Sequence, residues 1–142
     1  MDTVLGTGDR PRVLSLVERK SGYLVLGKLS ARTTAAVSRR ALQLIPRERQ
    51  PVHTITADNG TEVHDYARIA RATGTAFYVA TPHHAWERGT NENTNGLIRQ
   101  NAPKRTSLAH LTRHDCTRIA RRLNRQPRKR LTYDTPEVRY AP

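Results

Sequence analysis

Alternating apolar and polar positions at the start of the chain predict three short strands. Residues 3–6 (TVLG) have the composition of a strand end, and the runs at 12–19 (RVLSLVER) and 23–29 (YLVLGKL) have the composition of two further strands. A break at Gly22 separates the second run from the third, as the turn of a hairpin would. We therefore expect the chain to open with an antiparallel meander.

Helical and strand patterns alternate through the rest of the chain. Apolar spacing predicts a helix over 30–45, with Ser30 or Thr33 as its N-cap and Pro46 as its stop. The elements predicted after it are a strand at 52–58, a helix at 65–74 closed by Gly74, a strand at 75–81, a helix that ends near Gln100 and a basic helix at 111–126 stopped by Pro127. This order predicts one domain over 1–142, of the α/β class, with a mixed five-stranded sheet flanked by helices.

The charge of the chain indicates a polyanionic partner. Twenty-five Lys and Arg oppose twelve Asp and Glu, which gives a formal net charge of +13. Nucleic acid is the usual partner of so basic a domain, although a merely soluble basic protein has the same composition. Aromatic residues are only 5%, which argues against a single-strand binder built on stacked rings.

The cysteine content and the absence of long apolar runs favour a cytoplasmic protein. A single cysteine, Cys116, provides no disulfide framework and indicates a reducing compartment. No apolar run is long enough to span a membrane, and the first residues lack the pattern of a signal peptide.

Three acids stand where strands and helices begin or end. Asp2 begins the first strand, Asp58 ends the fourth strand in TADNG, and Glu92 lies in RGTNENTNG (88–96) at the entry to a helix. If the first and fourth strands are neighbours, their carboxylates would face each other and Glu92 could join them. Three converged carboxylates need a divalent cation, and their hard oxygen ligands suit Mg²⁺ or Mn²⁺. Two such ions can support an in-line phosphoryl displacement by water or by a 3′-hydroxyl.

Each acid also has an ordinary structural explanation. An Asp before Asn-Gly is commonly a turn residue, and an Asp at position 2 is commonly frayed. A Glu in the first turn of a helix, such as Glu92, commonly complements the macrodipole. The basic run RRLNRQPRKR at 121–130 is either a solvated helix face or a contact to the phosphate backbone, of which we favour the second.

Five segments together resemble one protein family. They are DTVLG at 2–6, LVERKSGYLVLGKL at 16–29, ITADNGTE at 55–62, WERGTNENTNGLIRQ at 86–100 and LNRQPRKRLTYDTPEVRY at 123–140. In these segments the chain resembles the catalytic domain of bacterial transposases of the insertion-sequence-thirty family, within the DDE group. The resemblance implies a ribonuclease-H-like fold and a triad of Asp2, Asp58 and Glu92. The 33 residues between Asp58 and Glu92 match the short spacing of that family.

The resemblance also implies the chemistry and the partners. It implies that two Mg²⁺ or Mn²⁺ ions support cleavage at transposon ends and attack of the freed 3′-hydroxyl on target DNA. It further implies a homo-oligomer on DNA, associated with the bacterial nucleoid. The candidate DNA-binding residues are Arg88, Asn91, Asn95, Arg99, Lys104, Arg128, Lys129 and Arg130. The asparagines among them would either position Glu92 or touch DNA.

The chain departs from the family pattern at several positions. No helix-turn-helix region precedes Asp2, and the first strand is short on the side of this residue, so we expect a catalytic core without end recognition. His83 and His84 stand where the family has other residues, and we interpret them as exposed loop residues, not metal ligands. The alternative function is a catalytically inactive remnant that binds DNA non-specifically or associates with full-length transposase.

Overall fold

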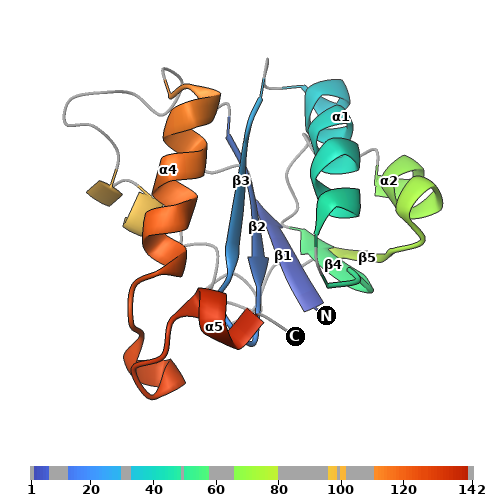
Figure 1. The fold of residues 1–142 in the computed structure, drawn as a ribbon. Coiled ribbons are helices and arrows are strands. Elements are labelled where there is room, and N and C mark those ends of the chain that lie inside the picture. The colour runs from blue at the N-terminus through green and yellow to red at the C-terminus, as the bar shows by residue number, and fades with distance from the viewer. Residues whose placement is uncertain are drawn as a thin grey trace.

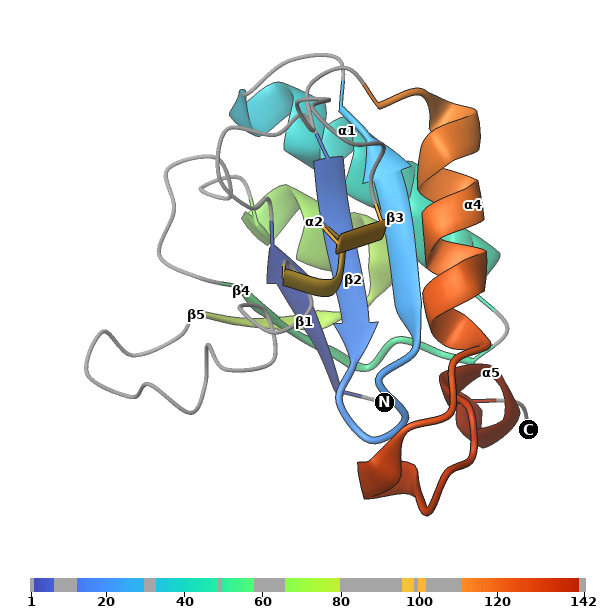
Figure 2. The same ribbon diagram turned by 90° about the vertical axis from the view of Figure 1, so that its left-hand side faces the viewer.

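The structure is a sheet with helices on both faces. It is a computed structural model that describes residues 2–6, 13–29, 33–48, 50–57, 66–79, 96–98, 100–101 and 111–140. Figures 1 and 2 show the strands between α1 and α2 on one side and α4 on the other. Among these residues, no helix has the length and apolar character needed to cross a membrane. The mixed helix and strand content predicted from the sequence is confirmed.

The sheet has the strand order β3-β2-β1-β4-β5. Its strands are β1 (Asp2–Gly6), β2 (Val13–Glu18), β3 (Leu24–Lys28), β4 (Thr54–Ala57) and β5 (Ala76–Val79). The first three strands pair antiparallel in sequence order, which confirms the predicted meander. In contrast, β4 pairs parallel with β1, and β5 pairs parallel with β4. The sheet is therefore mixed, and β1 lies at the junction of its antiparallel and parallel halves.

The turn between β2 and β3 needs a glycine. Gly22 has φ of +73°, a left-handed conformation that a residue with a side chain rarely adopts. Its N–H donates to the carbonyl of Glu18 at 2.7 Å. The hairpin that the sequence predicted around Gly22 is confirmed.

Helix α1 (Thr34–Leu44) packs on one face of the sheet. Its N-cap is Thr33, whose hydroxyl accepts from the backbone N–H of Ala36 at 3.1 Å, so of the two predicted caps the structure shows Thr33 in this role. The chain continues as the 3-10 helix η1 (Ile45–Arg47), which contains Pro46 in its first turn. The predicted stop at this proline is therefore correct to within two residues.

Helix α2 (Tyr66–Thr73) follows on the same face as α1. Gly74 ends it with φ of +71° and donates its N–H to the carbonyl of Ala70 at 2.9 Å. This is the C-terminal glycine cap that the sequence predicted.

Helix α4 (Arg113–Asn124) covers the opposite face, beside the edge strand β3 (Figure 2). It begins with a capping box, in which Thr112 and Asp115 each accept from the other's backbone N–H at 3.0 Å. The tail, for which we predicted no regular element, contains the 3-10 helix η4 (Lys129–Leu131) and helix α5 (Pro136–Tyr140). These elements are too short for apolar periodicity to reveal.

Two apolar clusters fill the space on either side of the sheet. The cluster beneath α1 and α2 contains Leu14, Leu16, Leu29, Val37, Ala41, Leu44, Ile45, Ile55 and Ile69. The cluster beneath α4 contains Val13, Val17, Leu24, Leu26, Ile98, Leu111, Cys116, Ile119 and Leu123. Alternate residues of β2 therefore contribute to opposite cores, as expected for a strand buried on both faces.

Candidate active site

The candidate active site depends on the pairing of β1 with β4. The sequence left the strand order open, and the structure shows these two strands as parallel neighbours, with Leu5 opposite Ala57. Asp58 comes directly after Ala57 in the chain. The approach of Asp2 to Asp58 requires that β1 and β4 be neighbours in the sheet, and they are neighbours.

The register places Asp2 away from the end of β4. Asp2 pairs with Thr54, and Leu5, three positions further along β1, pairs with Ala57. At about 3.3 Å per residue, roughly 10 Å of strand separates the level of Asp2 from that of Ala57. Asp2 therefore lies at the amino end of the β1–β4 pair, whereas Asp58 follows its carboxyl end in the chain.

Most of the predicted site lies outside the described residues. This holds for Asp58 and Glu92, for the predicted DNA contacts Arg88, Asn91, Asn95, Arg99 and Lys104, and for His83 and His84. Whether the three acids converge therefore stays a prediction. Within the described ranges, His, Cys, Asp and Glu residues form no group of three that could hold a metal ion. The fit of a divalent ion rests on the oxygen-donor chemistry of the acids.

The start of the helix that follows Glu92 is docked beneath α4. Residues 96–98, 100 and 101 are helical, and Ile98 is 3% exposed in the cluster that also contains Val17 and Leu111. The amide nitrogen of Asn101 donates to the carbonyl of Leu97 at 2.9 Å. The helix predicted after RGTNENTNG is thus anchored on the sheet face that α4 covers.

The three predicted basic contacts in the tail have different surroundings. Arg128 is half-buried and donates from Nη2 to the carbonyl of Leu123 at 3.2 Å. Burial, with a smaller contribution from Arg130, lowers the pKa of Arg128. Lys129 and Arg130 are exposed, and Arg130 donates from Nη1 to the carbonyl of Lys20 at 3.2 Å. Arg128 is therefore hydrogen-bonded to the backbone of Leu123 near the end of α4, and Lys129 and Arg130 are the more accessible cations.

These basic residues lie toward the amino end of β1. Lys20, which Arg130 contacts, belongs to the β2–β3 turn, and Glu18 at the start of that turn pairs with Thr3. The end of β1 beside this turn is the one that carries Asp2. Arg130 is therefore nearer to the level of Asp2 than to that of Ala57.

Exposed arginines on α4 were recognised only in part from the sequence. Arg118, Arg121, Arg122 and Arg125 are all exposed, while Cys116 and Ile119 on the other side of the helix are buried. The phosphate contact predicted from the sequence begins at residue 121 and so leaves out Arg118, although Arg118 lies within the predicted basic helix at 111–126. The helical period of 3.6 in 111–126 could have identified it.

Glu18 is a buried acid with a structural role. Its carboxylate accepts from the backbone N–H groups of Lys20 at 3.0 Å and Ser21 at 2.7 Å, and from the Ser21 hydroxyl. Burial raises the pKa of Glu18, but the hydrogen bonds from Ser21 and Lys20 outweigh burial and leave the pKa below its ordinary value. This carboxylate closes the β2–β3 turn.

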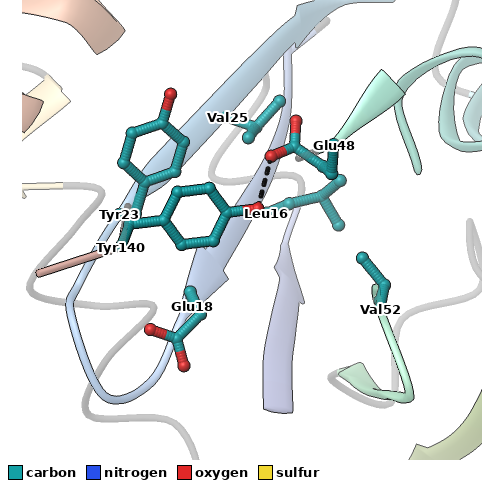
Figure 3. A pocket seen from close by; sticks show the side chains of 7 residues that line it. All are labelled: Leu16, Glu18, Tyr23, Val25, Glu48, Val52 and Tyr140. Carbon is teal, nitrogen blue, oxygen red and sulfur yellow. Dashed lines mark hydrogen bonds between the residues drawn. The ribbon is translucent and has the colours of Figure 1, made fainter. Parts of the chain in front are cut away.

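A small pocket near this turn is closed by aromatic rings. It is lined by Leu16, Glu18, Tyr23, Val25, Glu48, Val52 and Tyr140 (Figure 3). The rings of Tyr23 and Tyr140 stack with centroids 4.1 Å apart, and the Tyr140 hydroxyl donates to Glu48 at 2.7 Å. These contacts attach α5 to the body of the domain, so we interpret the pocket as a packing feature.

The chain is similar in sequence to insertion-sequence transposases, although no protein-family model matches it. It is 38% identical over 140 residues to the transposase for insertion sequence element IS4351 of Bacteroides fragilis, which covers 99% of this chain and 43% of that protein. It is 39% identical over 140 residues to transposase InsI for IS30A of Escherichia coli (strain K12), which covers 96% of this chain and 36% of that protein. The chain thus spans about two fifths of the length of these relatives.

A structural comparison gives the fold independently of the sequence. The catalytic core domain of BIV integrase superposes with a TM-score of 0.73 over 98% of this chain and 91% of that domain. The two share 18% identity, so the likeness shows the fold alone. From both comparisons, the chain is similar in sequence to insertion-sequence transposases, including that of IS30A, and its fold is that of an integrase catalytic core.

Proposed function

We propose that this chain is the catalytic core of a DDE transposase, with a ribonuclease-H-like fold. In this role it directs water to cleave a DNA strand at each transposon end, which frees a 3′-hydroxyl. That 3′-hydroxyl then attacks a phosphodiester of target DNA, which joins the two strands and releases a 3′-hydroxyl of the target. The observation that carries the proposal is the parallel pairing of β1 with β4 in a chain that aligns almost end to end with insertion-sequence transposases. That pairing joins the strand that contains Asp2 to the strand after which Asp58 follows.

Asp2, Asp58 and Glu92 are proposed as the ligands of two Mg²⁺ or Mn²⁺ ions. Carboxylate oxygens are the ligands that these cations prefer, and asparagines around Glu92 can orient it without adding charge. Bound there, the ions would activate water or a 3′-hydroxyl and stabilise the leaving oxygen. We propose that Arg88, Arg99, Lys104, Lys129 and Arg130 hold DNA phosphates in reach of the acids.

The β1–β4 register places a condition on the convergence of the three acids. Asp2 is paired about 10 Å before the level of Ala57, so Asp58 and Asp2 share one metal site only if the chain after Ala57 returns toward Asp2. Fe²⁺ bound in place of Mg²⁺ provides a direct test, because radicals generated at the iron cut the nearby backbone. Cuts at all three acids would support convergence. Cuts near Asp58 and Glu92 without cuts near Asp2 would remove Asp2 from the metal site.

Activity is tested on a DNA duplex that ends in a free 3′-hydroxyl at a transposon end. We expect Mn²⁺-dependent strand transfer by the wild-type chain and none by Asp58→Asn or Glu92→Gln, with DNA binding retained in both. Each substitution removes one carboxylate while conserving volume, and the loss of one metal ligand removes the electrostatic basis of the reaction. Asp134→Asn, at an exposed position before α5, is the matched control and should transfer strands as wild type does.

Strand transfer by Asp58→Asn at the wild-type rate would refute the proposal. A wild-type chain that binds DNA in a salt-sensitive way but transfers no strand would favour the inactive remnant instead. Partners are part of the same proposal, namely transposon ends and target DNA in the bacterial cytoplasm, with the chain acting as a homo-oligomer. Sedimentation with and without an end-bearing duplex measures that oligomeric state.

A further inference from the structure

The outward face of α4 carries a row of arginines. The exposed residues Arg118, Arg121 and Arg122 of α4 and its C-cap Arg125 are here called the arginine ridge. Successive members are three, one and three residues apart. The opposite side of the helix is buried, with Cys116, Ile119 and Leu123 each 1% exposed. The packing of those three side chains fixes the rotation of α4, and so it holds the ridge toward solvent.

The ridge has the dimensions of a phosphate-binding surface. From Arg118 to Arg125 the helix rises by about 10 Å at 1.5 Å per residue, which corresponds to about three phosphates on one strand of a duplex. Guanidinium groups remain charged and match phosphate geometry with paired donors. A cationic row of this length on a rigid helix can therefore follow one strand of DNA.

Little negative charge offsets the ridge. Asp115 contacts Arg118 at 3.4 Å and Glu137 contacts Arg125 at 3.2 Å, both at the surface. Exposed pairs of this kind contribute little to stability, so a phosphate can displace them. Within the described part of the chain, neither Arg121 nor Arg122 has an ion-pair partner.

The ridge is separate from the β1–β4 pair. Helix α4 packs on β2 and β3 through Val17 and Leu24, whereas the β1–β4 pair lies toward the other edge of the sheet. From β3 to β4 there are three strand spacings of about 4.8 Å. The exposed ridge also lies on the side of α4 opposite its buried residues Cys116, Ile119 and Leu123. DNA bound at the ridge is therefore displaced from the β1–β4 strand pair.

We infer that the arginine ridge binds the phosphate backbone of duplex DNA that flanks the cleavage point. The choice of DNA as occupant rests on the proposed function. The ridge then acts as a second, sequence-independent DNA contact that extends the footprint of the chain beyond the acids. It is distinct from the contacts proposed for Lys129 and Arg130, which lie beside the β2–β3 turn.

The test compares two double variants with the same loss of charge. Arg121→Gln/Arg122→Gln removes half of the ridge, and Arg39→Gln/Arg71→Gln removes two exposed arginines from α1 and α2 on the opposite face. Affinity for a long duplex and for a short duplex that contains only the transposon end is measured against salt. We expect the ridge variant to bind the long duplex about 50-fold more weakly at about 0.1 M salt. The slope of the logarithm of its binding constant against the logarithm of the salt concentration should be smaller in magnitude by about 2. We expect its affinity for the short duplex to change little.

Two outcomes would overturn the inference. One is an equal loss of affinity in both double variants, which would mean that net charge alone governs binding. The other is an unchanged salt slope in the ridge variant, which would mean that the ridge contacts no phosphate. Arg121→Lys/Arg122→Lys guards against a folding artefact because it keeps the charge, and it should restore most of the binding. An Asp58→Asn chain that still transfers strands would refute the proposed function and leave the ridge result standing.

Discussion

The side-chain amide of Asn124 pairs with both backbone polar groups of Leu24, although the two residues are 100 positions apart. Its Nδ2 donates to the Leu24 carbonyl at 2.8 Å, and its Oδ1 accepts from the Leu24 N–H at 2.8 Å. Leu24 begins β3, which is an edge strand of the sheet. Asn124 thus supplies the hydrogen bonds that a further strand would supply, and it joins the end of α4 to the sheet.

Asn124→Ala should destabilise the domain by about 2–4 kcal/mol. The substitution removes two buried hydrogen bonds and leaves the N–H and C=O of Leu24 without these partners. Urea unfolding measures the effect as a lower midpoint. Thr117→Ala is the matched control on the same helix, because the exposed Thr117 hydroxyl donates only to Arg113 of its own helix, and it should change stability by less than about 0.5 kcal/mol. Equal effects of the two substitutions would contradict the bridging role of Asn124.

Tyr140→Phe should loosen the attachment of α5. The substitution keeps the ring stacked on Tyr23 but removes the hydroxyl that donates to Glu48 at 2.7 Å. A hydrogen bond to a charged group contributes about 1.5–3 kcal/mol, so the free energy of unfolding should fall by that order. Tyr133→Phe removes an equivalent hydroxyl from a ring that is 68% exposed, and it should have no measurable effect. A Tyr140→Phe domain as stable as wild type would show that the ring alone holds α5.

Alkaline pH should weaken the same attachment. Burial, together with the hydrogen bond to Glu48, raises the pKa of Tyr140 above its ordinary value of 10.0. A raised pKa in the folded state means that the contribution of Tyr140 to stability is complete below pH 10 and is lost as the pH rises toward that raised pKa. Wild type should therefore lose more stability above pH 10 than Tyr140→Phe does. Parallel curves for the two proteins would exclude Tyr140 as the source of the alkaline loss.

Acid should weaken the β2–β3 turn through Glu18. Burial raises the pKa of its carboxyl group, but the hydrogen bonds from Ser21 and Lys20 outweigh burial and lower the pKa below the ordinary 4.5. The carboxylate therefore stabilises the fold above pH 4.5, and this contribution is lost as the pH falls through the lowered pKa. Glu18→Gln should be less stable at neutral pH and should lose less stability between neutral pH and acid. An equal loss of stability in acid by wild type and by Glu18→Gln would exclude Glu18 as the source of the acid dependence.

Gly27→Ala should destabilise the contact between β3 and α1. A Cβ at Gly27 would lie 2.7 Å from Cδ1 of Leu44 and 2.8 Å from Nε of Arg40. Forcing these side chains aside costs about 1–3 kcal/mol, which thermal unfolding can measure. Gly96→Ala is the control, since a Cβ there meets nothing within 4 Å, and its stability should be equal to or above that of wild type.

If Gly96→Ala also lowers strand transfer at unchanged stability, then Gly96 permits a close approach of backbone to DNA.

The sequence predicted the local elements well because their signals are local. The runs of residues that became β2 and β3, the glycine turn at Gly22 and the cap at Gly74 all follow from periodicity and backbone preference within a few residues. The elements missed in the tail are the 3-10 helix η4 and helix α5. The stability of the five-residue α5 comes from Tyr140 contacting Tyr23 and Glu48 far back in the chain. No window of neighbouring residues contains that information.

By itself the sequence determined the succession of most strands and helices along the chain, the large positive charge and the presence of three acids in family-like motifs. Tertiary structure decided that β1 lies between β2 and β4, that Asp2 is paired with Thr54, and that Arg128 turns toward the carbonyl of Leu123. It also decided that α4 presents its arginines outward, because Cys116, Ile119 and Leu123 are buried against the sheet. Strand order, register and helix rotation are set by burying apolar area between segments that are distant in sequence. The burial of apolar area stabilises the fold only after these distant segments have come into contact.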